Sequence, residues 1–169
     1  LGFVQTKRDI CIVTKISFSD GAAEQARPLY LIGKNDLSDW LETLPKADRN
    51  WLEAAGFKAA AGELVLIPGP KGVQGAAGGL GGEKDRKRKR FVAASLRAKL
   101  PQGDWTFEST LTGDDLTEAA LGWLLAGYRF DRYAGAPAPK ADLVAPSGIN
   151  AARLERIAAG EAMARDLIN

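Results

Sequence analysis

The chain has 169 residues and a formal net charge of +2, and 46% of its residues are hydrophobic. This length and composition suit one globular domain with a single sizeable core. The small net charge argues against a protein-wide basic surface of the kind that binds nucleic acid. No apolar run approaches the ~20 residues needed to cross a bilayer, and the first residues lack the pattern of a secretory signal. We therefore expect a soluble, cytoplasmic protein with no membrane partner.

Histidine is absent from the chain, and Cys11 is its one cysteine. Without imidazole, the chain cannot carry a Ser-His-Asp or Cys-His constellation, an HExxH zinc site or a His/Cys zinc site. Cys11 lies in an apolar stretch and is predicted to be a small buried side chain in a protein of a reducing compartment. We predict no catalytic, cofactor-binding or metal-ligating residue in this chain. The acidic residues form isolated pairs that favour helix starts over metal binding, namely Asp36 with Asp39, Glu83 with Asp85, and Asp114 with Asp115.

The first predicted elements are two strands and a helix. β-Branched residues predict a strand over residues 9–18, and the turn-forming residues 19–21 end it. The apolar run 28–33, between a proline and a glycine, is typical of a strand that is buried on both faces. Asn35 or Asp36 can cap the helix that follows, because a short polar side chain accepts hydrogen bonds from free N–H groups at a helix start.

A second helix is predicted from Pro45 to Gly56. Proline at the first helical position loses no needed hydrogen bond, and glycine suits the left-handed stop after the last turn. Trp40 and Trp51 lie on the apolar stripes of these two helices. We therefore expect both tryptophans in the core rather than in a ligand-stacking role.

A hairpin is predicted next, with arms at residues 63–67 and 73–80 and a turn rich in proline and glycine between them. Its second arm overlaps the glycine-rich stretch 75–82. One interpretation of this stretch is a phosphate-binding loop. The stretch contains no Gly-Lys-(Ser/Thr), and no Gly-x-Gly-x-x-Gly in the required place between a strand and a helix. Glycines in a strand more often allow close packing, and we favour that interpretation.

Six of the seven residues 84–90 are Lys or Arg, in an unbroken run from Arg86 to Arg90. They lead into an apolar stretch with helical periodicity, so one helix is predicted over residues 84–100. A basic run is a signal for phosphate binding through counterion release. The small net charge, and the lack of interleaved aromatic residues other than Phe91, favour a solvated helix face instead.

The remaining pattern predicts a strand at residues 105–111, the longest helix at 114–133, a strand at 142–145 and a final helix at 151–169. Strands that alternate with helices, several with continuous apolar runs, predict an α/β fold with a mixed sheet flanked by helices on both faces. Asn150 is a plausible cap for the final helix, whose inward side chains are predicted to be Leu154, Ile157, Ala164 and Leu167 or Ile168.

Leu125 to Tyr133 and Ala164 to Asn169 are two motifs in the last third of the chain, and together they resemble motifs of the leucyl aminopeptidase (cytosol aminopeptidase) family of metallopeptidases. The last six residues, Ala164 to Asn169, resemble the Arg-(Asp/Glu)-Leu-(Ile/Val)-Asn segment at which the family passes from its N-terminal domain into its catalytic domain. Upstream, Leu125 to Tyr133 resembles the family's Leu-x-x-Tyr-x-Phe-x-x-Tyr helix end. The two motifs stand in the family's order, with a strand-like segment between them.

The resemblance implies a macro-like N-terminal α/β accessory domain over residues 1–148. A helix over residues 149–169 would then lead toward a catalytic domain that is absent from this chain. In the family, that domain uses two divalent metal ions, zinc or manganese, to activate the water that removes N-terminal residues from peptides, and the enzyme is a hexamer. The implied protein is thus a hydrolase whose chemistry lies in its own C-terminal domain. Leu167 and Ile168 are expected to pack on that domain.

Two other functions stay open on the residues alone. A macro-like binder of ADP-ribose or a related nucleotide would use residues 75–82 to contact phosphate. A nucleic-acid-binding module would use the basic run, although the net charge argues against a nucleic-acid partner.

Overall fold

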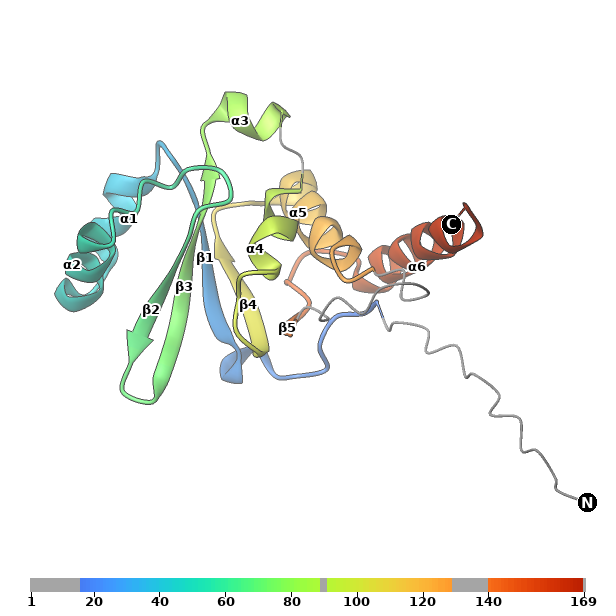
Figure 1. Cartoon of the computed structure of the whole chain (residues 1–169), viewed down its shortest axis with the longest axis horizontal. Helices are drawn as coiled ribbons and strands as arrows, with labels where there is room; N and C mark the ends of the chain where they lie inside the picture. Colours follow the sequence, from blue (N-terminus) through green and yellow to red (C-terminus); the bar gives the residue numbers. More distant parts are fainter. Residues whose placement is uncertain (1–15, 89–90, 129–139, 169) are drawn as a thin grey trace, which may run out of the picture.

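The structure is a computed structural model, and it describes residues 16–88, 91–128 and 140–168 (Figure 1). Five strands and six α-helices follow one another in this part of the chain, with a short 3-10 turn at Ala23–Gln25 before them. The elements in chain order are β1 (Arg27–Gly33), α1 (Leu37–Thr43), α2 (Lys46–Ala54), β2 (Leu64–Gly69), β3 (Gly72–Gly81), α3 (Glu83–Arg88), α4 (Val92–Arg97), β4 (Gly103–Ser109), α5 (Gly113–Leu125), β5 (Ala141–Leu143) and α6 (Ala151–Ile168).

The five strands form one mixed sheet in the order β2-β3-β1-β4-β5. The central strand β1 runs parallel to both neighbours, with Leu29 opposite Ala76 on β3 and opposite Phe107 on β4. β2 and β3 pair antiparallel and form the predicted hairpin. β5 adds a short parallel strand beside β4. The predicted mixed sheet is therefore confirmed.

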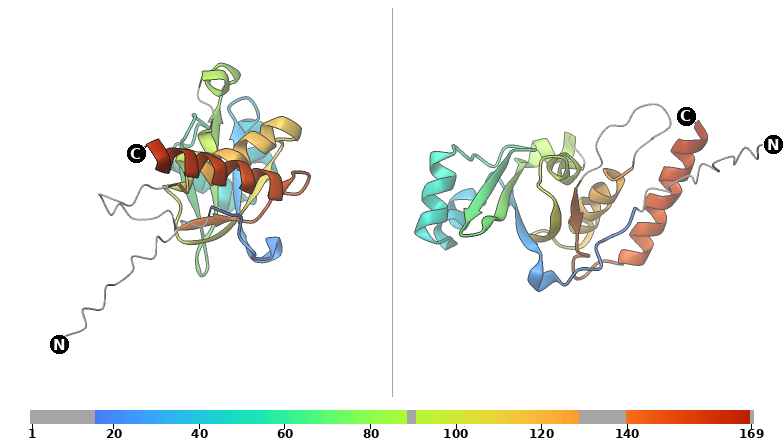
Figure 2. Two further views of the ribbon diagram at one scale, coloured as in Figure 1. Left: turned by 90° about the vertical axis from the view of Figure 1, so that its right-hand side faces the viewer. Right: turned by 60° about the horizontal axis from the view of Figure 1, so that its bottom comes forward.

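Helices cover both faces of the sheet, as predicted (Figure 1). α1 and α2 lie on one face, and α4 and α5 lie on the other. α6 packs on α5 and lies farther from the sheet (Figure 2). The core is divided in the same way into two clusters. The cluster beside α1 and α2 includes Ile32, Leu52, Phe57 and Ile67, and the larger cluster beside α4 and α5 includes Leu29, Leu96, Trp105, Trp123 and Leu143.

The two tryptophans of α1 and α2 differ in burial. Trp40 is partly buried, and its ring lies 5.3 Å from that of Tyr30 and 6.3 Å from that of Phe57. Trp51 is 48% exposed, and its indole N–H donates a hydrogen bond to the carbonyl oxygen of Leu66 at 2.9 Å. The core prediction is therefore wrong for Trp51. The amphipathic indole lies on the surface because its N–H has a partner in the edge strand β2.

The basic stretch forms two helices rather than the predicted one. α3 ends at Arg88, α4 begins at Val92, and Phe91 between them has a left-handed conformation with a φ of 61°. A left-handed residue cannot continue a right-handed helix. The Phe91 ring packs closely on α5, where a Cβ added to Gly122 would lie 2.7 Å from its Cδ1 atom. This tertiary contact overrides the helical pattern of the sequence.

Two predicted helix ends are confirmed by their geometry. The Oδ1 atom of Asn150 accepts a hydrogen bond from the N–H of Arg153 at 3.0 Å, so Asn150 caps α6. Gly56 has a φ of 71° just after α2, as expected of a left-handed stop. Pro45 occupies the cap position of α2. Asp36 precedes α1 without making a side-chain cap hydrogen bond.

The last helices differ in length from the prediction. α5 has 13 residues and ends at Leu125, whereas α6 has 18, so the expectation that the helix from Asp114 is the longest is wrong. Gly127 follows two residues after the end of α5. Residues 129–133 lie outside the described part of the chain. Most of the strand predicted over residues 9–18 also falls outside it. Neither α6 nor any other helix in the described ranges is long and apolar enough to cross a membrane.

The inward face of α6 is narrower than predicted. Leu154 and Ala158 are buried against the rest of the domain. The helix covers the outside of α5 rather than the sheet, so only this one stripe is covered. Ile157 and Ala164, which were predicted to face inward, are exposed, and so are both Leu167 and Ile168, of which one was predicted to face inward.

Candidate functional site

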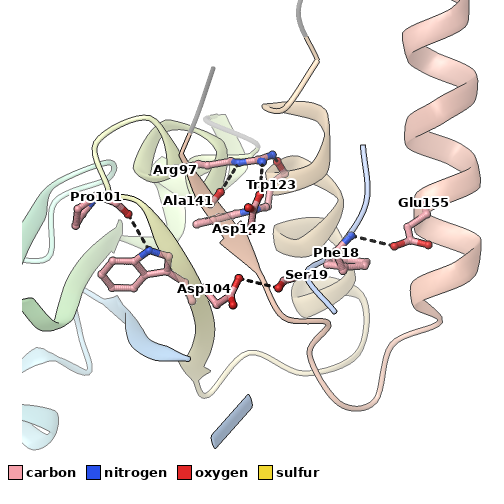
Figure 3. Close-up of polar contacts among 10 residues, drawn as sticks. Phe18, Ser19, Arg97, Pro101, Asp104, Trp123, Ala141, Asp142 and Glu155 are labelled. Atoms are coloured by element: carbon pink, nitrogen blue, oxygen red, sulfur yellow. Dashed lines mark hydrogen bonds and ion pairs between the residues drawn. The ribbon is translucent and has the colours of Figure 1, made fainter. Parts of the chain in front are cut away.

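A buried arginine joins α4, α5 and β5 (Figure 3). Arg97 is 8% exposed, and its Nε donates to the carbonyl oxygen of Ala141 at 3.0 Å. Its Nη1 donates to the carbonyl oxygen of Trp123 at 2.8 Å, and its Nη2 lies 3.4 Å from Asp142 Oδ1. The guanidinium also lies 5.6 Å from the Trp123 ring centre. Burial lowers the pKa of Arg97, and the carboxylate of Asp142 opposes that shift.

The partners of Arg97 indicate a structural role. Two of them are main-chain carbonyl groups, one in the last turn of α5 and one in the edge strand β5, so the side chain fastens a helix end to the sheet. Trp123 Nε1 is buried without a hydrogen-bond partner among the described residues. This cluster was not predicted from the sequence. The one sequence signal for it is the position of Arg97. This charged residue directly follows Leu96 and lies three residues before Leu100, on a helix stripe that is otherwise apolar.

Further polar contacts in Figure 3 hold the segment before β1 against the domain. Ser19 Oγ donates to Asp104 Oδ1 at 2.7 Å, and the N–H of Phe18 donates to Glu155 Oε1 of α6 at 2.9 Å. Trp105 Nε1 donates to the carbonyl oxygen of Pro101 at 3.2 Å. A serine beside an aspartate without a base to take its proton is not a nucleophile. These contacts therefore position elements rather than perform chemistry.

The glycines of β3 serve close packing, as favoured from the sequence. β3 is an interior strand that pairs with β1 on one side and β2 on the other. A Cβ added to Gly78 would lie 2.6 Å from Leu96 Cδ1. A Cβ added to Gly79 would overlap the carbonyl oxygen of Ala60 and lie 2.5 Å from the carbonyl carbon of Ala59. The missing side chains thus admit α4 on one face and the chain before β2 on the other.

The main-chain amides at the end of β3 already have partners. Gly79 N–H donates to Glu63 O at 2.8 Å, and Gly81 N–H donates to Ala59 O at 2.9 Å. The N–H of Gly82 donates to Asp85 Oδ2 at 3.2 Å, so a carboxylate holds the place that a phosphate would need. The phosphate-binding interpretation of residues 75–82 is therefore not supported by this geometry.

The carboxyl ends of β1 and β3 form the point at which an open α/β sheet usually binds ligands. The chain leaves β1 toward α1 on one face and leaves β3 toward α3 and α4 on the other, and ligands bind at such switch points. Here residues 57–62 lie against β3, with Phe57 and Ala59 buried. Part of the expected crevice is thus filled by the protein itself.

The predicted acidic pairs stay separate in the fold. Asp39 lies in the first turn of α1, and the other two pairs lie in the first turns of α3 and α5. Within the described ranges, no three His, Cys, Asp or Glu side chains come together in a way that could hold a metal ion. The prediction that the chain holds no metal-ligating or catalytic residue remains a prediction for the chain as a whole.

The pKa of Tyr30, on the central strand β1, is shifted from its ordinary value. Burial raises its pKa, and the carboxylates of Glu108 and Asp48 raise it further. The folded state therefore holds the phenolic proton more tightly than the unfolded chain, where the pKa is about 10. The resulting stabilisation is fully present below about pH 10 and is lost as pH rises through the folded-state pKa.

We expect the substitution Tyr30→Phe to flatten the fall in unfolding free energy above about pH 10, because it removes the group whose ionisation favours unfolding. Urea unfolding of both proteins at several pH values from about 8 to 11 measures this slope, in the range where tyrosine ionises. Equal slopes for the two proteins would contradict the prediction.

These features define an α/β domain whose polar contacts fasten its own elements together. The sequence model of the M17 aminopeptidase N-terminal domain matches residues 27–146. The chain belongs to this family, and the family predicted from the motifs at residues 125–133 and 164–169 is confirmed. Parts of both motifs lie outside the described residues.

Solved structures with the same fold include three enzymes. Cytosol aminopeptidase from Coxiella burnetii is 23% identical with a TM-score of 0.68, over 88% of this chain and 32% of that one. A mutant tomato leucine aminopeptidase is 14% identical with a TM-score of 0.54, over 86% and 35%. The bottromycin maturation enzyme BotP is 22% identical with a TM-score of 0.56, over 85% and 33%. This chain thus spans about a third of each. The curated protein sequences give no match.

Proposed function

We propose that this chain is the non-catalytic N-terminal domain of a metal-dependent leucyl-type aminopeptidase. The match of residues 27–146 to the N-terminal domain of M17 aminopeptidases carries the proposal. Residues 1–148 form its macro-like α/β domain, and residues 149–169 lead toward the catalytic domain. The parent enzyme is a cytoplasmic hexamer that removes N-terminal residues from peptides.

The metal chemistry of this enzyme belongs to the catalytic domain. Two divalent ions, zinc or manganese, would activate a water there for attack on the peptide carbonyl. The residues in the described part of the chain do not fit such a pair of ions, because the acidic pairs there are separated at the starts of three helices. The chain contributes architecture to the enzyme rather than ligands.

We expect the purified 169-residue chain to show no turnover of leucyl substrates above the buffer rate, with or without added zinc, manganese or magnesium. The physical reason is that two-metal hydrolysis needs carboxylates converging on ions about 3.5–4 Å apart. Release of leucine from leucyl-p-nitroanilide measures the rate. The positive control is the longer polypeptide translated from the same gene with its downstream sequence, which should be active. Metal-dependent turnover that copurifies with the 169-residue chain through successive columns would overturn the proposal.

Neither alternative is favoured by the geometry. A nucleotide binder would need free amides at residues 75–82, but the amides of Gly79, Gly81 and Gly82 already donate to oxygens of residues 63, 59 and 85. A nucleic-acid module would need a basic surface, and Glu83 and Asp85 stand at the start of α3 beside the basic run.

A further inference from the structure

The second half of α6 has little buried surface to hold it in place. Leu154 and Ala158, the two buried residues of α6, both lie in its first half. Beyond Ala158, no residue up to Ile168 is buried. Gly160 weakens this part further, because glycine disfavours a helix and a Cβ added here would meet nothing within 4 Å. A helix end with so little buried surface is expected to fray unless other contacts hold it.

The last turn of α6 has such contacts, and they converge on one tyrosine. The hydroxyl of Tyr128 donates a hydrogen bond to Asp166 Oδ1 at 2.8 Å. The guanidinium of the neighbouring Arg165 lies 5.3 Å from the centre of the Tyr128 ring, within range of a cation–π interaction. Two successive side chains of α6 thus contact the hydroxyl and the face of the same ring. These three residues are here called the α6 latch.

The tyrosine of the latch stands on a well-packed part of the domain. Tyr128 lies three residues after the end of α5, and its N–H donates to the carbonyl oxygen of Leu125 at 3.1 Å. Gly127 is buried, and a Cβ added to it would lie 2.6 Å from Arg97 Nη1. The same Nη1 donates to the carbonyl oxygen of Trp123 in α5. The buried Arg97 therefore fixes the chain just before Tyr128, and the end of α6 is the side of the latch that can move.

The latch also joins the two sequence motifs from which the family was predicted. Tyr128 belongs to the motif at residues 125–133, and Arg165 and Asp166 belong to the motif at residues 164–169. The tyrosine and the aspartate are 38 residues apart along the chain, yet they are hydrogen-bonded. The Arg-Asp pair of the second motif therefore has its partner within this domain.

We propose that the α6 latch is a conformational device that keeps the last turns of α6 folded and fixes the direction in which the chain leaves the domain. With the latch closed, α6 stays helical to Ile168 and its end lies against the end of α5. With the latch open, the part beyond Gly160 loses these contacts and is free to fray or to bend at the glycine. The inference rests on the proposed function in one respect, namely that this direction leads toward the catalytic domain.

Contacts of this size are sufficient because the opening of a helix end has a free energy near zero. A hydrogen bond to a charged group changes such an equilibrium by on the order of tenfold, and an exposed cation–π contact changes it by about threefold. The latch therefore decides whether the closed or the open form of the α6 end dominates, although it adds little to the stability of the whole domain.

Native-state hydrogen exchange of the 169-residue chain tests the latch. Tyr128→Phe removes the hydroxyl but keeps the ring, and we expect the amides of residues 164–168 to exchange about tenfold faster. Arg165→Met should speed their exchange about threefold. The amides of β2 and β3 should keep their rates in both variants, because the change is local. Tyr30→Phe is the matched control, since it removes the same atom on β1 and should leave exchange at the end of α6 unchanged.

A double-mutant cycle shows whether the hydroxyl acts through Asp166. If it does, Tyr128→Phe should have no further effect on exchange at the end of α6 in an Asp166→Ala background. An undiminished tenfold effect in that background would overturn the assignment of the hydrogen bond as the origin of the protection.

Distances between two spin labels test the direction of the chain. In a Cys11→Ser background, one label is attached at Met163→Cys on α6 and the other at Ala47→Cys on α2, both exposed positions. We expect one narrow distance distribution with the latch intact and a broader one after Tyr128→Phe. Equal distributions in the two chains would overturn the latch as the element that sets the direction of α6.

Failure of the latch and failure of the proposed function have different readouts. The exchange and spin-label measurements need no catalytic activity, so they decide about the latch in either case. A longer polypeptide that hydrolyses leucyl substrates, together with a 169-residue chain in which Tyr128→Phe changes neither measurement, would overturn the latch alone. A longer polypeptide without activity would overturn the proposed function, whereas faster exchange in Tyr128→Phe would still support the latch.

Discussion

Replacing Arg97 with methionine is expected to lower the free energy of unfolding by about 3–5 kcal/mol, the usual cost of removing one member of a buried charged network. The substitution keeps most of the apolar stem but leaves the carbonyl oxygens of Ala141 and Trp123 without their donors. Such orphaned acceptors are costly, because they lose water without gaining another partner. Urea unfolding followed by tryptophan fluorescence measures the change.

Two further variants make the Arg97 result specific. Arg97→Lys keeps the charge but cannot supply three donors in a planar fork, so an intermediate loss is expected. Arg153→Met removes an exposed arginine of α6 and should change stability by less than about 0.5 kcal/mol. If Arg97→Met and Arg153→Met proved equally mild, the guanidinium would not be fastening α5 to β5.

The substitution Gly79→Ala is expected to cost about 3 kcal/mol, the upper part of the usual range for overpacking. A Cβ at this position meets main-chain atoms of Ala59 and Ala60, which cannot rotate away as a side chain could. The strand is interior and paired on both sides, so it cannot move aside without losing hydrogen bonds to β1 or β2. The free energy of unfolding from urea titration measures the loss.

Gly160→Ala is the matched control for this chemical change. The same methyl group enters open space on α6, and alanine is the better helix former, so a gain of roughly 0.5–1 kcal/mol is expected. The two substitutions should therefore have opposite signs. A loss at position 160 as large as that at position 79 would contradict the packing argument.

The periodicity of the sequence was sufficient to predict most elements of the sheet. The apolar run 28–33, the hairpin around residues 68–72 and the alternation from Trp105 each correspond to a strand, because burial of one or both faces leaves a local pattern. The caps at Gly56 and Asn150 were equally predictable, since their geometry depends on one residue and its immediate neighbours.

The features missed by sequence analysis depend on contacts between distant residues. Phe91 divides a helix because its ring meets Gly122, and Trp51 stays on the surface because Leu66 offers it an acceptor. Arg97 is buried because three carbonyl or carboxylate oxygens from α5 and β5 surround it. Local spacing carries no information about such partners, 15 to 45 residues away along the chain.

The hydrogen bond from Trp51 to β2 affects how the domain associates with itself at high protein concentration. β2 ends the sheet, and an uncovered edge strand is a template onto which a second molecule can add its own strand. The indole occupies the Leu66 carbonyl, and Pro68 has no N–H to offer. Two successive hydrogen bonds that would join this sheet to the sheet of a second molecule therefore cannot form. This protects the domain against growth into ordered aggregates along the β2 edge.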